Sequence, residues 1–375
     1  MDLNSREQED RAAWIALAHA AEPADASVAR LVARLGARET VDRIRGGMSG
    51  LRHQEGLLAR MAAQHPETAE DRAHRIGARI ITPGDREWPT QVDALAPLAP
   101  FALWVLGAAD LRLLALRSVS IVGARACSMY GVEIARSWAA ELGSLGWTVI
   151  SGAALGIDAA AHHGALAADG VTIAVVAGGV DVPYPRAHAP LLTAIADQGV
   201  VVSEVPLGER VRRQRFLSRN RVIAALARAT VVVEAAERSG TAATARAAQS
   251  MARPVLAVPG PVTAPASLGC HRMIQGGEAQ LAAGIEDVLV AVDLDAGLRY
   301  EHSAIDGHGS QPDPIASRVR DAIPARGGIT PDGLVCATGL PEADVSRALA
   351  SLSDDGLLAY SLDGWRLTDR GRLRR

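Results

Sequence analysis

The sequence predicts an α/β protein: a doubly wound parallel sheet of the extended Rossmann-like type, preceded by a helical domain and followed by a winged helix. Between residues 118 and 258, β-branched runs recur, and most lead into a turn of small residues and then a helical run. Residues before position 76 have apolar positions at helical spacing. The last sixty or so residues have the pattern of three helices and a hairpin. A chain of 375 residues also exceeds one ordinary core, which favours several domains.

Residues 1–75 are predicted to form a small helical domain of the helix-hairpin-helix or SAM-like kind. Trp14 and Leu17, then Val28 and Leu31, follow helical spacing on either side of the breaker Glu22-Pro23. Some modules with this layout bind DNA, and others serve for packing or docking. Both interpretations stay open for this segment.

Residues 76–296 are predicted to form the sheet domain. Two apolar stretches, 80–81 and 101–106, lead into it. The expected parallel strands cover residues 118–122, 148–150, 172–176, 200–203, 230–233 and 254–258. In such a sheet the ligand lies beyond the carboxyl ends of the strands, which here are lined with small residues.

Residues 297–313 lack periodicity and are rich in Gly, Ser, His, Asp and Pro, so we expect a linker. Residues 314–375 predict the winged helix, with helices at 314–323, 330–337 and 341–352 and a hairpin around 362–364. The third helix usually enters a DNA groove. Here it carries Glu342 and Asp344, so protein contact or autoregulation is as well supported as DNA reading.

Composition restricts the partners. The formal net charge is −3, so a polyanion must be met by a local basic patch. The chain has no lysine, so its permanent positive side-chain charges are all arginine, and seven arginines lie between Arg210 and Arg228. The three cysteines fit no disulfide framework or metal spacing, the amino terminus resembles no signal peptide, and no apolar run is long enough for a membrane span. We therefore expect a cytoplasmic protein with no membrane partner.

The stretch from Phe216 to Thr244 is the best candidate site. Arg219, Asn220 and Arg221 are expected at the start of a helix, a buried strand follows, and residues 239–241 open a second helix. Backbone N–H groups at a helix start attract anions, and guanidinium groups match phosphate oxygens. The stretch therefore predicts a phosphate site.

Several chemistries are disfavoured by the motifs. The turn after residue 122 has one glycine where a dinucleotide fingerprint needs three, and a P-loop needs a lysine. Asp158 and Asp181 are interpreted as carboxylates that fix turns, His162 and His163 as packing residues, and Glu204 and Glu234 as side chains that could face the pocket. We expect no catalytic residue, metal or cofactor. Phosphate-binding turns beside an aromatic residue, without a reaction centre, are typical of a clamp for a nucleic-acid strand.

The order of motifs resembles the DNA-processing protein A family, also called DprA or Smf. The resemblance covers residues 84–290 and rests on the motifs IVGARACSMYG, SGAALGIDAAAHHGAL, GGVDVPYP, SEVP, FLSRNRVIAAL, VVVEAAERSGTAATA and AVPGPV. It implies DNA contacts at Arg125, Ser151, Gly152, Phe216, Arg219, Asn220, Arg221, Ser239, Gly240 and Thr241. Ala124, Ala177 and His271 depart from the usual family pattern.

The resemblance also implies a function. A member would bind single-stranded DNA that enters during natural transformation, protect it, displace single-strand-binding protein and load the RecA recombinase. It would act as a homodimer and without catalysis.

An enzyme on a related fold is the alternative. Phosphoribohydrolases of the LOG type have a catalytic glutamate three residues after the threonine of PGGxGTxxE, and Thr244 stands at that place here. A purely structural docking protein is the third interpretation, and it leaves the arginine cluster unexplained.

Overall fold

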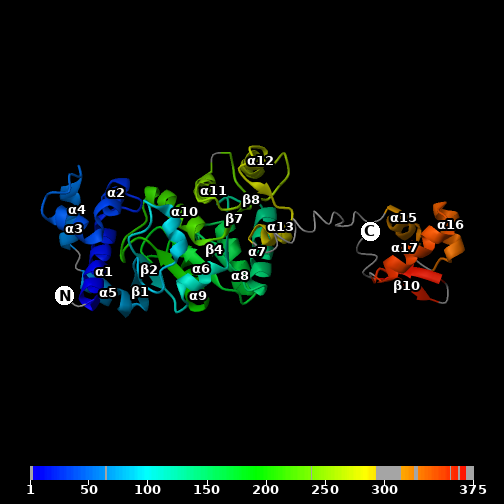
Figure 1. The fold of residues 1–375 in the computed structure, drawn as a ribbon, viewed down its shortest axis with the longest axis horizontal. Coiled ribbons are helices and arrows are strands. Elements are labelled where there is room, and N and C mark those ends of the chain that lie inside the picture. The colour runs from blue at the N-terminus through cyan, green and yellow to red at the C-terminus, as the bar shows by residue number, and fades with distance from the viewer. Residues whose placement is uncertain are drawn as a thin grey trace. The chain divides into compact units, whose positions relative to one another are not determined.

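The computed structural model divides into two units, Met1–Leu294 and Asp295–Arg375 (Figure 1). It describes residues 3–63, 66–237, 239–292, 314–324, 328–354, 356–361 and 364–368. The predicted linker, residues 297–313, lies outside these ranges. Within them, no helix is both long enough and apolar enough to cross a membrane.

The first unit is built on a nine-stranded sheet. Its strands, in spatial order, are β1 (Ala78–Ile81), β2 (Leu103–Leu106), β6 (Val200–Ser203), β5 (Thr172–Val175), β4 (Thr148–Ser151), β3 (Ser118–Val122), β7 (Ala229–Val232), β8 (Val255–Ala257) and β9 (Gln280–Leu281). The run from β6 to β9 is parallel, whereas β1 pairs antiparallel with β2 and β2 with β6. The predicted α/β fold with a mostly parallel sheet is confirmed, with an antiparallel extension at one edge.

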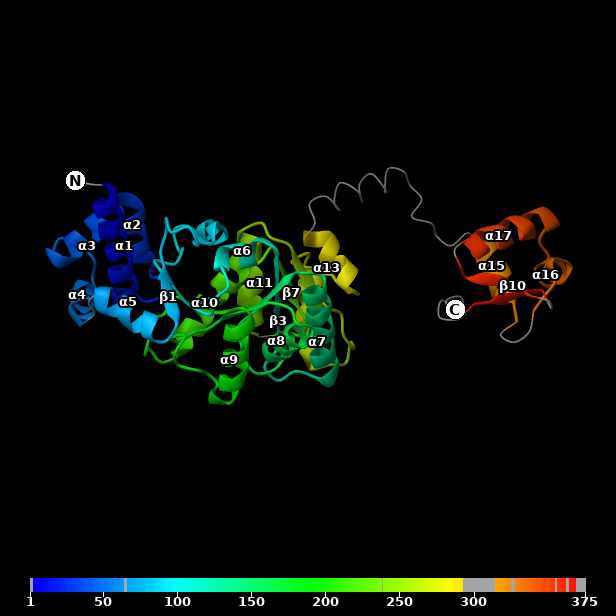
Figure 2. The same ribbon diagram turned by 90° about the horizontal axis from the view of Figure 1, so that it is seen from below.

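Helices cover both faces of the sheet (Figure 2). The face with Val122 and Val232 packs against α6 (Leu111–Leu116), α10 (Arg213–Leu226), α11 (Thr241–Ser250) and α12 (Leu268–Gln275). The face with Ile121 and Val231 packs against α7 (Met129–Ser144), α8 (Ile157–Ala167) and α13 (Ile285–Val292), and α9 (Ala189–Gln198) covers β5 and β6 on that side. Adjacent residues of a strand point to opposite faces, so each β-branched run fills two cores.

Five helices precede the sheet: α1 (Leu3–Ala20), α2 (Ala26–Leu35), α3 (Ala37–Arg45), α4 (Gln54–Ala63) and α5 (Pro66–Arg75). They have a core of their own, which includes Leu17, Val28 and Leu57. Ile15 of α1 and Ala73 of α5 also pack in one cluster with Trp104 of β2. The helical segment is thus continuous with the core on one side of the sheet. Short 3₁₀ turns, η1 (Thr90–Leu95), η2 (Arg186–His188) and η3 (Pro265–Ser267), complete the unit.

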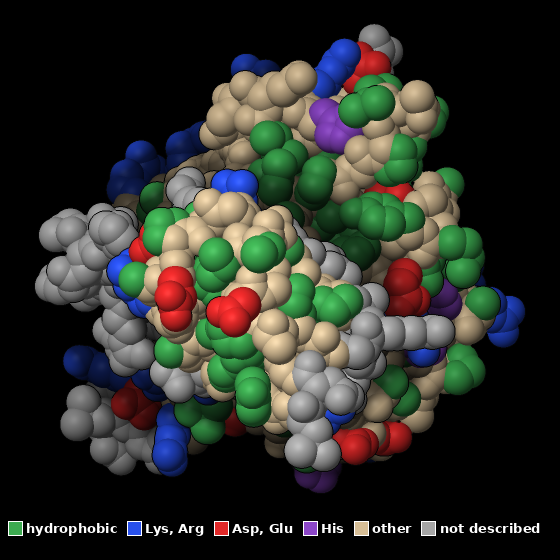
Figure 3. Space-filling view, turned by 90° about the vertical axis from the view of Figure 1, so that its right-hand side faces the viewer, with side chains coloured by type: hydrophobic (Ala, Val, Ile, Leu, Met, Phe, Trp, Pro, Cys, Tyr) green, Lys and Arg blue, Asp and Glu red, His purple; other side chains and the backbone are tan. Residues whose placement is uncertain are grey.

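The second unit contains α15 (Pro314–Ala322), α16 (Pro331–Thr338), α17 (Glu342–Asp354) and the antiparallel strands β10 (Leu358–Ser361) and β11 (Gly364–Leu367). The hydroxyl of Thr330 caps α16 by accepting the Gly333 N–H at 3.2 Å. Three helices and a hairpin agree with the sequence pattern, and the identification as a winged helix stays a prediction. Figure 3 shows Asp and Glu side chains among apolar ones on the side of the molecule that faces the viewer. On α17, Asp344 pairs with Arg347 of the same helix at 3.2 Å.

Candidate nucleic-acid interface

A cavity of about 670 Å³ lies at the point where the order of the parallel strands in the sheet reverses. β4, β5 and β6 follow β3 on one side, and β7, β8 and β9 lie on the other. Such a switch point leaves a crevice at the carboxyl ends of the two central strands. The cavity, called the pocket below, is lined by Val122, Gly123, Ala124, Arg125, Ala154, Asp158, Tyr184, Val211, Arg213, Phe216, Leu217, Arg219, Asn220, Ile223, Ser239, Gly240, Thr241 and Thr244.

Helix α10 forms one wall of the pocket. It begins at Arg213, so the expectation that Arg219, Asn220 and Arg221 stand at a helix start is wrong: they lie in its middle. Arginine and glutamine are good helix formers, and no breaker separates them from the apolar run at residue 222. The helix therefore extends two turns further than its apolar residues indicate.

Aromatic and basic side chains meet at the mouth of the pocket. The guanidinium carbon of Arg125 lies 4.9 Å from the ring centroid of Phe216. Tyr184 contacts the same ring, with centroids 5.5 Å apart. Arg125 and Arg213 are exposed, and Phe216 is half-buried. This arrangement offers exposed cations for phosphates and an aromatic surface for a base.

The turn at Ser239–Thr241 forms the opposite wall and opens α11, as predicted. The Thr241 N–H donates to the Ser239 hydroxyl oxygen at 3.1 Å, and the two hydroxyls lie 2.9 Å apart. The Asn220 amide, across the pocket, donates to the Gly240 carbonyl at 3.3 Å. The sequence predicted unpaired N–H donors here, and this is wrong for the first three: the Thr241 N–H has a side-chain partner, and the N–H groups of residues 242 and 243 donate to backbone carbonyls.

Arg219 lies beneath the pocket floor. It is 7% exposed, and its Nη1 donates to the carbonyl oxygen of Gly152 at 2.7 Å and to that of Val175. Burial lowers the pKa of Arg219 to about 10, and the nearby Asp158 carboxylate opposes this shift. Its Nε has no hydrogen-bond partner among the residues that the structure describes. Arg219 therefore supports the strand ends and contributes positive charge to the pocket from below.

Ser151 and Gly152, at the end of β4, lie deeper. The Ser151 hydroxyl donates to the Ile121 carbonyl at 2.6 Å, and the Gly152 N–H donates to Asp158 Oδ2 at 3.2 Å. Gly152 also lines a smaller adjoining cavity of about 80 Å³, together with Arg125, Tyr184 and Phe216. The structure thus brings seven of the ten predicted contact residues to the pocket and Gly152 to its neighbour, whereas Ser151 and Arg221 line neither.

Arg221 points to the other side of α10. Its Nη2 donates to both carboxylate oxygens of Glu204 at 2.6 and 2.8 Å, and the two side chains are 9% and 10% exposed. Arg215, in the same helix, pairs with Glu22 and Glu209. Part of the arginine cluster that suggested a basic patch therefore stabilises the fold.

The chain matches the family model of DNA recombination-mediator protein A over residues 79–293. It belongs to this family. It is similar to the putative DNA processing protein DprA of Mycobacterium tuberculosis, with 40% identity over 96% of this chain and 95% of the relative. Protein Smf of Escherichia coli is 36% identical over 76% of both chains.

Two solved structures of family members are similar to this one. The X-ray structure of DprA from Streptococcus pneumoniae aligns with a TM-score of 0.63 and 30% identity, over 75% of this chain and 96% of that one. DNA processing protein A from Helicobacter pylori, studied for its single-stranded DNA binding mode, aligns with a TM-score of 0.51 and 26% identity, over 59% of this chain and 96% of that one.

Arg213 and Tyr184 line the pocket but are not among the contacts that the sequence and the family resemblance predicted. Arg213 lies one helical turn before Phe216. A predicted helix that began at Arg213 would have placed it on the same face as Phe216. Tyr184 lies in the GGVDVPYP motif, which carries the resemblance to the DNA recombination-mediator family. Both side chains are exposed, and in this family member they add to the surface at the mouth of the pocket.

Acidic side chains of this family member stabilise local structure. Asp181 accepts the Gly208 N–H at 2.9 Å and fixes a turn, as predicted. Glu234 accepts the Ser128 N–H at 2.9 Å at the start of α7, and so does not line the pocket. Among the described residues that line the pocket, Asp158 is the one carboxylate, and burial raises its pKa. In the described part of the chain, no group of three His, Cys, Asp or Glu residues could hold a metal ion.

Proposed function

We propose that this member of the DNA recombination-mediator family binds single-stranded DNA in the pocket, without catalysis. This proposal is based mainly on the pocket at the carboxyl edge of the sheet, where the exposed arginines Arg125 and Arg213 lie beside the rings of Phe216 and Tyr184. Phosphates would contact the two arginines, and a base would stack on an aromatic ring. The single-stranded DNA binding mode studied for the Helicobacter pylori relative supports the same ligand.

The wider role follows from the family. We propose that the protein is cytoplasmic and homodimeric, protects incoming single strands during natural transformation, displaces single-strand-binding protein and loads the RecA recombinase. Ser239, Gly240, Thr241 and Asn220 would contact the strand beside the arginines, and Arg219, Gly152 and Ser151 would shape the pocket from beneath. For Arg221 we propose a supporting role through Glu204.

The first experiment measures the affinity for poly-dT across a range of salt concentrations. The double variant R125A/R213A should bind more weakly. Its plot of log Kobs against log salt should be shallower by about 0.7 for each phosphate that the variant no longer neutralises.

Arg228→Ala is the matched control. Arg228 is exposed, and its N–H donates to the Ser118 carbonyl at the amino ends of β3 and β7, opposite the pocket. It removes one arginine charge without touching the site, so binding should stay close to wild type. If the affinities of wild type and R125A/R213A for poly-dT depended equally on salt, the DNA strand would bind elsewhere on the protein.

Two further assays separate the other functions. Incubation with adenosine monophosphate derivatives tests the LOG-type alternative, which predicts free base. Thr244, at the place of the glutamate, is buried and gives the pocket a hydroxyl. RecA activity on DNA coated with single-strand-binding protein tests loading, and an unchanged lag after addition of this protein would remove that part of the proposal.

A further inference from the structure

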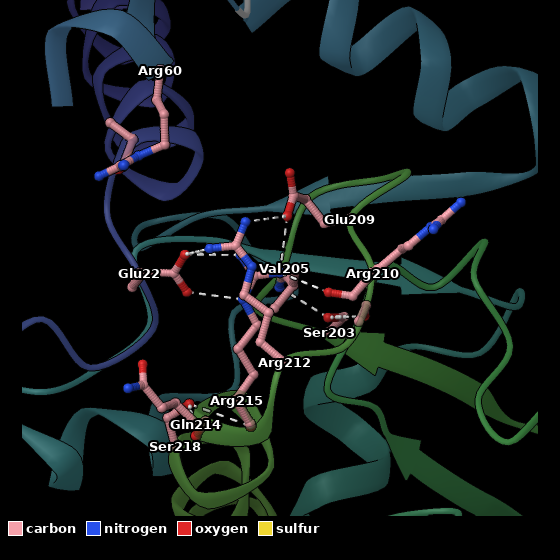
Figure 4. Close-up of polar contacts among 12 residues, drawn as sticks. Glu22, Arg60, Ser203, Val205, Glu209, Arg210, Arg212, Gln214, Arg215 and Ser218 are labelled. Carbon is pink, nitrogen blue, oxygen red and sulfur yellow. Dashed lines mark hydrogen bonds and ion pairs between the residues drawn. The ribbon is translucent and has the colours of Figure 1, made fainter. Parts of the chain in front are cut away.

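The first turn of α10 is held by a residue of the helical segment. Arg215 is 7% exposed, and its Nε and Nη2 donate to the two carboxylate oxygens of Glu22 at 2.9 and 3.0 Å (Figure 4). Its Nη1 donates to Glu209 at 3.0 Å. Arg212 adds a third bond to Glu22 at 3.0 Å. Such paired, parallel bonds fix orientation as well as distance.

Glu22 is itself held in place. It lies in the connection between α1 and α2. The Ala20 carbonyl, at the end of α1, accepts a bond from Arg60 of α4. Asp25 caps α2 by accepting the N–H groups of Ser27 and Val28 at 2.9 and 3.2 Å. The connection is therefore anchored at both ends, and Glu22 presents its carboxylate from a fixed position.

Glu22 stays charged at neutral pH. The hydrogen bond from Arg215 lowers the pKa of Glu22 below its ordinary value, and burial opposes this shift. The bond between the two elements is thus a full ion pair in the pH range where DNA binding takes place.

Arg215 stands between two residues of the pocket wall. Arg213 precedes it by two positions and Phe216 follows it directly. In a helical turn these three backbones move together, so fixing the Arg215 guanidinium also restrains the positions from which the Arg213 and Phe216 side chains project.

We propose that Glu22 is a positioning residue for single-stranded DNA. Through Glu22, the helical segment fixes the position of the first turn of α10, and this turn carries Arg213 and Phe216, which contact the DNA. This proposal rests on the proposed function of the pocket. It gives the helical segment a part in binding without any contact between that segment and DNA.

An electrostatic role and a positioning role of Glu22 predict opposite changes in DNA affinity when its charge is removed. Glu22 is a negative charge near an arginine-rich surface, so neutralising it should strengthen the attraction of phosphates. If Glu22 positions α10, the same change should weaken binding. A loss of affinity in Glu22→Gln therefore cannot come from the changed net charge.

The test compares full-length wild type, E22Q and E39Q for binding to poly-dT, at a temperature where melting curves show all three folded. Glu39 is an acid of the same segment that pairs with Arg43 in its own helix at 2.7 Å, so E39Q removes the same charge without touching α10. We expect E22Q to raise the Kd roughly tenfold, equivalent to about 1.4 kcal/mol. E39Q should leave it unchanged. The salt slope of E22Q should equal that of wild type, because every arginine that would neutralise a phosphate is still present.

Hydrogen exchange gives a second readout. In E22Q the amides of residues 215–219, the first of α10 with hydrogen-bond partners, should exchange faster, while those of α2 and α3 keep their protection. Wild-type binding together with unchanged or tighter binding by E22Q overturns the positioning role and leaves the proposed function intact. Absence of poly-dT binding by wild type itself overturns the proposed function instead.

Discussion

The guanidinium of Arg219 occupies the space that a side chain at Gly152 would fill. A Cβ atom at Gly152 would lie 2.5 Å from Cζ of Arg219, and Nη1 of the same group donates to the Gly152 carbonyl at 2.7 Å. The family motif with Ser151 and Gly152 and the motif with Arg219 are therefore two halves of one packing contact. The glycine is needed for the arginine to reach the strand ends.

Gly152→Ala should destabilise the first unit. The added methyl group must displace a buried guanidinium, and overpacking of this kind costs about 1–3 kcal/mol. Urea unfolding measures the change. Gly240→Ala is the control, since no atom lies within 4 Å of its Cβ position, and it should cost under about 1 kcal/mol. Equal stability of G152A and wild type would show that Arg219 has room to move.

Phe216→Ala should weaken poly-dT binding by about 1–3 kcal/mol, the usual contribution of one base stacked on an aromatic ring. Phe216→Tyr keeps the ring and should bind nearly as well as wild type. Val211→Ala removes apolar surface from the same pocket without removing a ring and serves as the comparison. If V211A and F216A lose the same affinity, the ring acts as apolar surface and not as a stacking platform.

Arg221→Ala should act on stability. It leaves the buried Glu204 carboxylate without its partner, and breaking a buried pair costs about 3–5 kcal/mol. The double variant R221M/E204L should recover most of this loss, because apolar residues can replace such a pair. Urea unfolding and poly-dT binding are measured together. Full stability of R221A with weakened binding would make Arg221 a direct strand contact, as the family resemblance implies.

His162 should make stability depend on pH. Its Nδ1 lies 2.7 Å from the Thr172 hydroxyl, which donates to the Val149 carbonyl at 2.7 Å. Burial lowers the pKa of His162 from 6.5 to about 3, so between these values the unfolded chain binds a proton that the folded one does not. Stability is therefore present above pH 6.5 and lost as pH falls toward 3, by up to about 1.36 kcal/mol per pH unit.

The variant H162N should flatten this slope in urea unfolding between pH 4 and 6.5, because the amide can replace the Nδ1–H donor and does not titrate. An unchanged slope would assign the acid sensitivity to other groups.

Much of the sheet could be predicted from the sequence because its strands are buried on both faces. The runs at residues 118–122 and 200–203 are continuous in buried residues and match β3 and β6. The antiparallel edge was not predicted. β1 pairs with β2 and β2 pairs with β6, and the second pairing depends on contacts between residues far apart in the chain, such as Trp104 with Ser203.

Most of the candidate site residues meet in one pocket, as the sequence indicated, but the roles of the arginines differ from those expected. The density of arginines in this part of the sequence could not show that Arg215 pairs with Glu22 and Arg221 with Glu204. The helical period places Arg215 and Arg219 on one face of α10, but only the packed structure tells which face meets the sheet. Exposed Arg125 and Arg213 are left for a ligand.

The shared packing of Ile15, Ala73 and Trp104 means that the family match at residues 79–293 leaves out part of the core on which its first strands pack. A chain that lacks residues 1–75 would lose part of the packing around Trp104, which is 0% exposed, and the acid that holds Arg215. Such a fragment should aggregate during expression even though it retains every strand of the sheet. Dissection of this protein should therefore cut after residue 292 and leave the amino terminus in place.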